Sequence, residues 1–370
     1  MKSLIFNYEP RLTSSDKKAA LEGVSKGIAN PSSINNFESY ISKLLNRPAI
    51  SCNSGTSALH LSLLATGTGP EDEVICPATT FAASWNVIKY VGASPVFVDV
   101  DIDTWCIDTK LIEQKITRKT RAVIAVDLHG NPCNYQELYR ICEKHGIVLI
   151  SDAAGAIGSY YNNKPLGSLA DINCMSMNLN KIITSNGGGI ISLGKKLQHK
   201  EEKIRQLLNQ SFMSSQKDGY DYNDLGFNYR FNSISAAIAM SQFSRLSKIL
   251  EKKKKINLQY RHRLSEKCEF QKPTKNSLPN NWMNTVVFKN KNLRNQVYKH
   301  LTSNNIESKL TYKPVNEVRW LKNQISEKFP KAERLYDGAV SLPSGLGLSE
   351  KQIDYICDQV IIALEQSDKR

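Results

Sequence analysis

Short β-branched runs alternate with segments of helical periodicity from about Ile50 to about Leu193, and this alternation restricts the fold more than any other feature of the chain. It is typical of βαβ units in a mostly parallel sheet. The strands expected are Glu73–Cys76, Pro95–Val100, Ala122–Asp127, Val148–Ser151, Ile172–Met177 and Gly188–Ser192, and the helices between them include Ser57–Ala65 and Cys133–His145. The sequence therefore predicts an α/β fold with a doubly wound sheet.

The pattern becomes mostly helical after Gly226. A long amphipathic segment, from about Ser233 to Glu266, is expected to connect a large domain to a smaller one, and the polar, proline-bearing stretch Gln271–Asn281 is typical of a boundary. The elements expected beyond it are a strand in TVVFKN and helices at Leu293–Asn304 and Ser349–Ser367. We predict a large domain at residues 1–245, including an N-terminal helical segment, and a small α+β domain at residues 246–370.

A chain of 370 residues with 41% hydrophobic composition can bury a substantial core, which excludes a small module held by disulfides. Its eight cysteines are scattered without a C-x-x-C pair, so we expect reduced, buried thiols and no metal site. The N-terminal stretch MKSLIFNYEP turns polar after three apolar residues, and no run reaches transmembrane length. We therefore expect a cytoplasmic protein that does not act at a membrane.

The net charge of +14 is compatible with nucleic acid, an anionic membrane surface or a small polyanionic substrate. The densest basic run, Lys252–Lys255, is interpreted as the solvated face of a helix, because apolar residues recur beside it at helical spacing. No RNP pattern or zinc knuckle accompanies the run, so we expect no nucleic-acid partner. The positive potential also suits a nucleotide-diphosphate substrate.

The segment SCNSGTSALHLSLLA places small, hydroxyl-rich residues directly before an apolar helix, where free backbone N–H groups favour a phosphate. On this segment alone, an ordinary helix N-cap by Ser54 or Thr56 is the favoured alternative. Neither a Walker loop nor a dinucleotide fingerprint is present in it.

Two further segments carry reactive side chains. In VLISDAAGAIGS, Asp152 ends a strand, where a carboxylate can keep a pyridine nitrogen protonated, although a helix cap or a metal ligand is an alternative. In DINCMSMNLNKIITSNGGGIIS, Lys181 precedes a glycine triplet, where a desolvated amine can form a Schiff base. An exposed loop lysine is the alternative. The order of the three segments within one α/β domain favours the cofactor interpretation.

These three segments belong to a larger set of motifs that follow one another along the chain. The collinear set is NSGTSALHL, PEDEVICPATTFAAS, GASPVFVDVD, HGNPCN, SDAAGAIGSYYNNKPLGSLADI, SMNLNKIITSNGGG and DLGFNYRFNSISAAIAMSQFSRL. With it the chain resembles, over nearly its whole length, the DegT/StrS family of nucleotide-sugar aminotransferases. The resemblance implies a fold-type I enzyme that uses pyridoxal 5′-phosphate and works as a homodimer.

The resemblance assigns a role to each matching position. Lys181 matches the Schiff-base lysine, Asp152 the partner of the pyridine nitrogen, and Phe81 the aromatic residue that stacks on the cofactor.

Thr56, Ser57 and Ser176 match donors to the cofactor phosphate. Asn228 and Arg230 match a loop that reaches the neighbouring subunit's site, which implies active sites shared between two subunits.

Two positions depart from the family's pattern. Gly155 stands where many relatives have Gln, Glu or His, so the usual contact near the cofactor's phenolic oxygen is missing. Asp127 stands where many have His, with His129 two residues on. Neither departure removes the lysine or the aspartate.

The resemblance also implies a substrate class, namely a 4-keto-6-deoxy sugar on a nucleotide, aminated from an amino acid such as glutamate for bacterial surface polysaccharides. HGNPCN and NKIIT are similar to perosamine synthases acting on GDP sugars, whereas TSNGGG, WMNT and YKPVNE are closer to enzymes acting on UDP sugars, which we favour. Trp282, Tyr312 and Lys313 fall in segments placed to meet the nucleotide, with a core position as the favoured alternative for Trp282.

Two other functional classes require residues that differ from those of this chain. Some relatives are dehydratases or non-catalytic sensors of the same fold, but those that dehydrate carry histidine in place of the lysine, and this chain has Lys181. A dinucleotide-dependent dehydrogenase requires the glycine fingerprint that is missing here.

Overall fold

A seven-stranded sheet forms the centre of the computed structural model, which describes residues 4–27, 32–212, 221–222 and 224–368. Its strands are β1 (Ala49–Cys52), β2 (Glu73–Pro77), β3 (Ser94–Val98), β4 (Thr120–Val126), β5 (Val148–Asp152), β8 (Ile172–Ser176) and β9 (Gly189–Leu193). They lie in the order β1-β9-β8-β5-β4-β2-β3. Only β9 within this sheet runs against its neighbours, so the mostly parallel sheet is confirmed. The six expected strands are correct to within two residues, and β1 was not expected.

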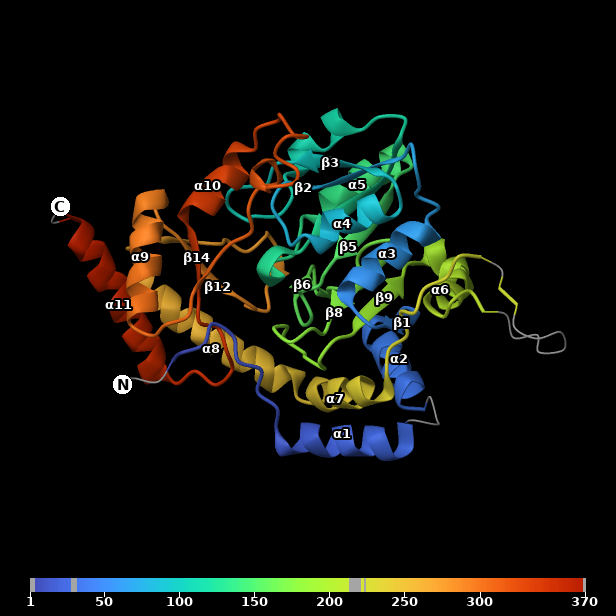
Figure 1. Ribbon diagram of the computed structural model, residues 1–370, viewed down its shortest axis with the longest axis horizontal. Helices are drawn as coiled ribbons and strands as arrows, with labels where there is room; N and C mark the ends of the chain where they lie inside the picture. Colours follow the sequence, from blue (N-terminus) through green and yellow to red (C-terminus); the bar gives the residue numbers. More distant parts are fainter. Residues whose placement is uncertain (1–3, 28–31, 213–220, 223, 369–370) are drawn as a thin grey trace.

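Helices cover both faces of this sheet (Figure 1). They are α2 (Ser32–Leu45), α3 (Gly55–Ala65), α4 (Ala83–Tyr90), α5 (Tyr135–His145), α6 (Glu201–Leu208) and α7 (Ser233–Phe243), while α1 (Ser14–Gly27) packs on the outer side of α7. Alternate strand residues enter different cores: Val123 packs in the cluster that contains α2, α5 and α7, whereas Ala122 and Ile124 pack with α3, α4 and α6. Both faces are therefore buried, as a doubly wound sheet requires.

The segment expected as one long helix from Ser233 is two helices. Asn232 caps α7 by accepting a hydrogen bond from the Ser235 N–H at 2.8 Å, and α8 (Leu246–Leu264) begins after a break at Ser244 and Arg245. Figure 1 shows α7 and α8 following one another from the central sheet to the C-terminal group of elements.

A second sheet lies in that C-terminal group, with the order β10-β12-β14-β13. Its elements are β10 (Glu269–Phe270), β12 (Asn284–Val287), β13 (Lys309–Leu310) and β14 (Ala339–Leu342), with helices α9 (Lys291–Ser303), α10 (Pro330–Gly338) and α11 (Glu350–Asp368). Ile256, Val286, Val340 and Ile356 share its core, which Ile5 joins from the N-terminal segment. The division of the chain at residue 246 stays a prediction.

Short elements complete the described structure. A small sheet contains β11 (Ser277–Leu278), β6 (Tyr160–Tyr161) and β7 (Lys164–Pro165), and the 3-10 helices are η1 (Thr109–Leu111), η2 (Glu113–Lys115), η3 (Leu128–Gly130), η4 (Lys195–Lys200) and η5 (Val315–Glu317).

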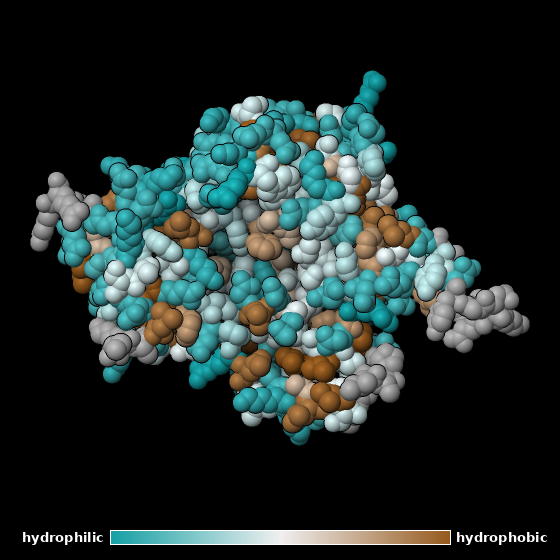
Figure 2. All heavy atoms as spheres, in the orientation of Figure 1, coloured by the Kyte–Doolittle hydropathy of each residue, from teal (hydrophilic) through white to brown (hydrophobic). Residues whose placement is uncertain are grey.

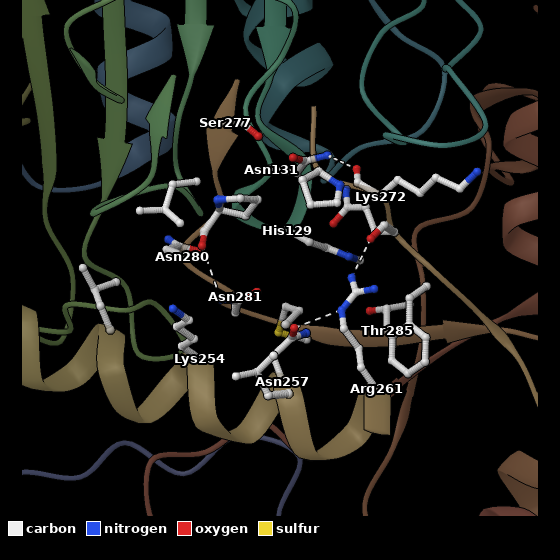
Figure 3. Close-up of a pocket in the computed structure, with 18 of the residues that line it drawn as sticks. His129, Asn131, Lys254, Asn257, Arg261, Lys272, Ser277, Asn280, Asn281 and Thr285 are labelled. Carbon is white, nitrogen blue, oxygen red and sulfur yellow. Dashed lines mark hydrogen bonds between the residues drawn. The ribbon is translucent and has the colours of Figure 1, made fainter. Parts of the chain in front are cut away.

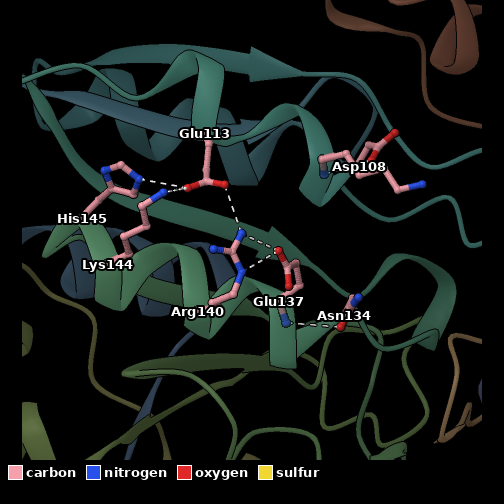
Figure 4. A network of polar contacts seen from close by, with 8 residues as sticks. Asp108, Glu113, Asn134, Glu137, Arg140, Lys144 and His145 are labelled. Carbon is pink, nitrogen blue, oxygen red and sulfur yellow. Dashed lines mark hydrogen bonds and ion pairs between the residues drawn. The ribbon is translucent and has the colours of Figure 1, made fainter.

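On the surface, η2 and α5 are joined by ion pairs around Glu113 (Figure 4). Its carboxylate lies 2.7 Å from Lys144 Nζ and 3.0 Å from Arg140 Nη2, and these hydrogen bonds lower its pKa to about 2. Because such exposed pairs are screened by water, the network contributes little to stability.

The interpretation of Lys252–Lys255 as a solvated face is wrong at one position. Lys253 is fully buried, and its ammonium donates hydrogen bonds to the carbonyls of Trp282 and Ser344. Burial lowers the pKa of Lys253 to about 7. Its neighbours Lys254 and Lys255 are exposed, as expected.

All eight cysteines lie in the described part of the chain as free thiols, and seven of them are buried. Among the described residues there is no group of three or more His, Cys, Asp or Glu side chains arranged to bind a metal ion. None of the helices within the ranges described above is both long and apolar enough to span a bilayer.

Candidate active site

A cavity of about 530 Å³ opens at the carboxyl ends of β4, β5 and β8, where ligands bind in doubly wound folds. Five of the predicted site residues line it: Thr56, Phe81, Asp152, Ser176 and Lys181. The structure thus brings side chains that are up to 125 positions apart, from Thr56 to Lys181, to one point.

One end of the cavity is the N-terminus of α3. The Ser54 hydroxyl caps this helix by accepting a hydrogen bond from the Ser57 N–H at 3.1 Å, so the N-cap alternative is correct for Ser54. The first turn still presents backbone N–H groups without helical partners beside the cavity. A Cβ at Gly55 would lie 2.9 Å from the Cβ of Ser176, so glycine lets the Ser176 hydroxyl approach this helix end. Hydroxyls and N–H groups here suit a phosphate.

Ser57 does not line the cavity. It is buried in the first turn of α3, where its hydroxyl donates to Asn53 Oδ1 at 2.6 Å and contacts the Ser54 hydroxyl at 2.9 Å. Its place is behind the phosphate end, where it holds the turn in position.

Asp152 lies at the floor of the cavity, buried at the end of β5. Its Oδ2 accepts a hydrogen bond from the Ser84 hydroxyl at 2.7 Å, and its Oδ1 accepts one from the Ala154 N–H at 3.1 Å. Burial raises the pKa of the Asp152 carboxyl, and these two bonds and the charge of Lys181 oppose the shift. A cation bound in the cavity would therefore stabilise the carboxylate.

Ser84, the donor to Asp152, was not predicted from the sequence. It lies in the first turn of α4, and the sequence shows only one of several hydroxyl residues in the segment PATTFAAS there. Thr80 contacts Ser84 through a 2.9 Å hydroxyl pair, so both help to orient the aspartate.

Lys181 extends from the loop that follows β8. Burial lowers the pKa of its ammonium to about 8, and the charge of Asp152 opposes the shift. Its backbone carbonyl accepts a hydrogen bond from the Tyr8 hydroxyl, a contact that the sequence did not predict. At neutral pH a larger fraction of this amine is unprotonated than in an ordinary lysine, as a nucleophile or base requires.

Aromatic side chains form the cavity mouth. Phe81 is 61% exposed, and its ring meets Tyr312 edge to face at 6.1 Å, which leaves a ring face free to stack on a planar ligand. Tyr312 lines the cavity, whereas Lys313 is exposed and does not. Trp282 is buried, as favoured, but it also lines the cavity, with Lys181 Nζ 3.8 Å from the centroid of its ring.

The side chain of Asp127 is occupied by its own loop. Its carboxylate accepts hydrogen bonds from the Tyr135 hydroxyl at 2.7 Å, the Ser151 hydroxyl at 3.2 Å and the Cys133 N–H at 2.9 Å. Burial raises its pKa to about 7. Aspartate at position 127, where many relatives have histidine, therefore stabilises the turn that carries His129.

His129 lines both the active-site cavity and a second cavity of about 630 Å³, which Figure 3 shows. Asn257 and Arg261 reach this cavity from α8, but Arg261 already bonds to Asn257 Oδ1 and the Gln271 carbonyl. Burial, followed by the charge of Lys181, lowers the pKa of His129 to about 4, and its Nδ1 has no protein partner. His129 is thus a neutral side chain with one free nitrogen beside the site.

Asn228 and Arg230 are exposed and do not line the cavity of their own chain. Their segment runs beside β1, where the Asn53 N–H donates to the Tyr229 carbonyl at 2.8 Å and Cys52 forms a bridge with Arg230. The segment is therefore close to the phosphate end of the cavity, with these two side chains turned to solvent.

Comparison with known proteins identifies the family and the fold. Residues 13–361 match the DegT/DnrJ/EryC1/StrS aminotransferase family. The chain belongs to this family. The GDP-perosamine synthase of Escherichia coli O157:H7 is 32% identical to this aminotransferase over 361 residues, covering 95% of this chain and 96% of that protein. The GDP-perosamine synthase of Caulobacter vibrioides is 35% identical over 323 residues, covering 86% and 85%.

The putative sugar aminotransferase Spr1654 from Streptococcus pneumoniae, solved in a PLP-form, superposes on this aminotransferase with a TM-score of 0.92, at 28% identity and over 99% of both chains. Aminotransferases of this family depend on pyridoxal phosphate, which confirms the expected enzyme class and cofactor.

The residues of this aminotransferase fit that cofactor. The buried carboxylate of Asp152 suits a protonated pyridine nitrogen. Lys181, with its lowered pKa, suits an aldehyde, and the free N–H groups at the N-terminus of α3 suit a phosphate. Phe81 leaves an aromatic face for the ring between them.

Proposed function

We propose that this enzyme moves an amino group from an amino acid, with glutamate as the donor, to a 4-keto-6-deoxy sugar carried by a nucleotide, in a pathway to bacterial surface glycans. The observation that carries the proposal is that the Lys181 amine and the Asp152 carboxylate share one cavity, which begins at the N-terminus of α3. The names of the two GDP-perosamine synthases support a nucleotide-sugar substrate.

When bound, pyridoxal phosphate supplies an electron sink for the carbanion formed at the donor's α-carbon. Lys181 Nζ anchors the cofactor and, once the donor has displaced it, accepts the proton from the α-carbon of that donor. Asp152 holds the proton on the ring nitrogen, and Ser84 orients Asp152. Gly55, Thr56 and Ser176 bind the phosphate end. When the keto sugar takes up the amine, the same Lys181 would deliver a proton to the sugar carbon that receives the nitrogen.

Lys181 also weighs against one alternative within the family, because a dehydratase of this fold carries histidine at this position. A non-catalytic sensor that binds pyridoxal phosphate would keep this lysine, and turnover of glutamate distinguishes it from the proposed enzyme.

The substrate assignment is tested by loading the protein with pyridoxal phosphate and offering glutamate with UDP-, GDP- and dTDP-linked 4-keto-6-deoxy sugars. We expect an amino sugar, identified by mass spectrometry, from one nucleotide series. The segments TSNGGG, WMNT and YKPVNE favour a UDP sugar. The GDP sugars are the comparison series, because the two relatives are GDP-perosamine synthases. Consumption of glutamate without amination of any sugar in the panel would contradict the proposal.

We further propose that the enzyme is a homodimer whose active sites are shared. Apolar side chains gather over α1 and α7 (Figure 2), and the exposed ones include Leu21, Val24 and Ile234. A second copy of this chain would remove them from water. The exposed Arg230 lies in a segment beside the phosphate end of the cavity, within reach of a partner packed on that face.

Hybrid dimers test the shared site. Lys181→Ala and Arg230→Ala are each expected to be inactive, and mixing them should restore part of the activity. If each site draws its lysine and its arginine from different chains, a hybrid has one site with both lesions and one with neither. Hybrids verified by mass that recover no activity would place Arg230 in the site of its own chain or in structural support.

A further inference from the structure

Trp282 and the residue at position 155 compete for the same space. A Cβ built on Gly155 would lie 2.4 Å from Cε3 and 2.7 Å from Cζ3 of the Trp282 ring, distances that side chains do not reach. Gly155 is thus the residue that admits the indole, and the indole fills the place where a side chain at position 155 would begin. Gly155 lines the cofactor cavity three residues after Asp152.

Hydrogen bonds to the backbone N–H and to the backbone carbonyl of Trp282 hold its ring in this place. The Trp282 N–H donates to Asn280 Oδ1 at 2.9 Å, while the Trp282 carbonyl accepts a hydrogen bond from the buried Lys253 ammonium at 3.0 Å. The Asn280 amide in turn donates to the Gly155 carbonyl at 2.8 Å. Trp282 is 4% exposed. Its indole therefore has little freedom to move away from Gly155.

The same indole contacts the segment that carries the reactive lysine in two ways. Its Nε1–H donates a hydrogen bond to the carbonyl of Asn180, and Lys181 Nζ lies 3.8 Å from the centroid of its ring. An ammonium over an indole face is attracted by the ring quadrupole. Because Asn180 and Lys181 are adjacent, one side chain restrains both the backbone and the amine of the lysine.

We propose that Trp282 is a positioning residue for Lys181, which this chain uses in place of a polar side chain at position 155. It holds the amine where it can both link to the cofactor and accept the donor's proton, and Gly155 is the residue that makes this possible. The proposal rests on the use of pyridoxal phosphate, and not on which nucleotide sugar is accepted.

A double-mutant cycle tests this exchange of roles. The variants are Gly155→Gln, Trp282→Ala and the two combined. Each single change should lower the fraction of Lys181 that borohydride reduces onto the cofactor: the first because glutamine displaces the ring, and the second because the restraint is lost. The combined variant should recover part of that fraction, since glutamine then enters the vacated space. Two losses that simply add would overturn the proposal.

A conservative change tests the hydrogen bond in the protein without cofactor. Trp282→Phe keeps an aromatic ring but cannot donate to Asn180. Amide exchange in residues 178–187 should then rise by about three- to tenfold, the effect of one hydrogen bond, with the unfolding temperature little changed. Trp85→Phe is the matched control, because Trp85 is also 4% exposed but lies in α4 and packs against Trp320. Equal exchange in both variants would overturn the proposal whatever the enzyme's substrate proves to be.

Discussion

Lys181→Ala is expected to abolish the covalent link to pyridoxal phosphate and to lower kcat by at least about 10²–10⁴-fold, the range for loss of one acid–base group. The fold should persist, because the side chain ends in the open cavity and not in a packed core. Borohydride reduction followed by peptide mapping checks the result: the wild type should carry the cofactor on Lys181. The exposed Lys313 supplies the control, and Lys313→Ala should retain the link.

The pH dependence of the free amine gives a second measure of the same residue. Since burial lowers the pKa of Lys181 to about 8, its reaction with a trace amine reagent in the protein without cofactor should increase as pH rises through about 8. Exposed lysines should increase in reactivity near their ordinary pKa of about 10.4. A label on a different lysine after borohydride reduction, or a Lys181 titration close to that of exposed lysines, would contradict the assignment.

The central strands were predictable because most are short apolar runs that contain β-branched residues, such as Thr120–Val126 and Val148–Asp152. β1 was not, because the four residues of AISC are stabilised by pairing with β9, in which Ala49 lies opposite Ser192. β9 is far from β1 in the sequence, and no local pattern of residues predicts their pairing. The long helical segment was predicted, but its break at Ser244 and Arg245 lacks proline or glycine, the usual signals of a helix end.

Lys253 shows how a residue type can mislead when the spacing is correct. The buried residues of α8 are Ile249, Lys253, Ile256, Tyr260 and Leu264, which recur at three and four positions. Position 253 thus lies on the buried face by periodicity alone. The lysines around it suggested a solvated run, but the carbonyls of Trp282 and Ser344, which receive its hydrogen bonds, come from distant segments.

The site was predictable to the extent that its chemistry is local. Asp152 ends a strand and Lys181 lies in the loop after one, both in recognisable segments, and both line the cavity. Their supports come from elsewhere: Ser84 from α4, Tyr8 from the N-terminal segment and Trp282 from a position 127 residues after Gly155. The sequence shows that position 155 has no side chain, but it does not predict that the Trp282 ring fills this space.

Asp152→Asn is expected to lower kcat by about 10²–10³-fold, the cost of removing one preorganised group that stabilises charge in the reacting state. An amide has no negative charge with which to hold the proton on the ring nitrogen. The fold should survive the change, because the Asn carbonyl can still accept from the Ala154 N–H, and the Ser84 hydroxyl, already paired with Thr80, can accept from the new amide. Single-turnover kinetics with glutamate, beside an unfolding curve, provide the measurement.

Asp127→Asn is the matched control for that experiment, because Asp127 is also buried beside the cavity while its carboxylate bonds to Tyr135, Ser151 and Cys133. It should lose stability, since an amide has only one acceptor oxygen for the hydrogen bonds that the two Asp127 oxygens now accept, but it should keep turnover within a few-fold. If Asp152 were only a cap for the turn at Ala154, the pattern would be reversed: Asp152→Asn would keep near-normal turnover, and Asp152→Ala would cost about 1 kcal/mol of stability with a modest kinetic effect. A large loss of turnover with the link to Lys181 intact distinguishes the two roles, since only a partner of the ring nitrogen affects the chemistry and leaves the covalent bond in place.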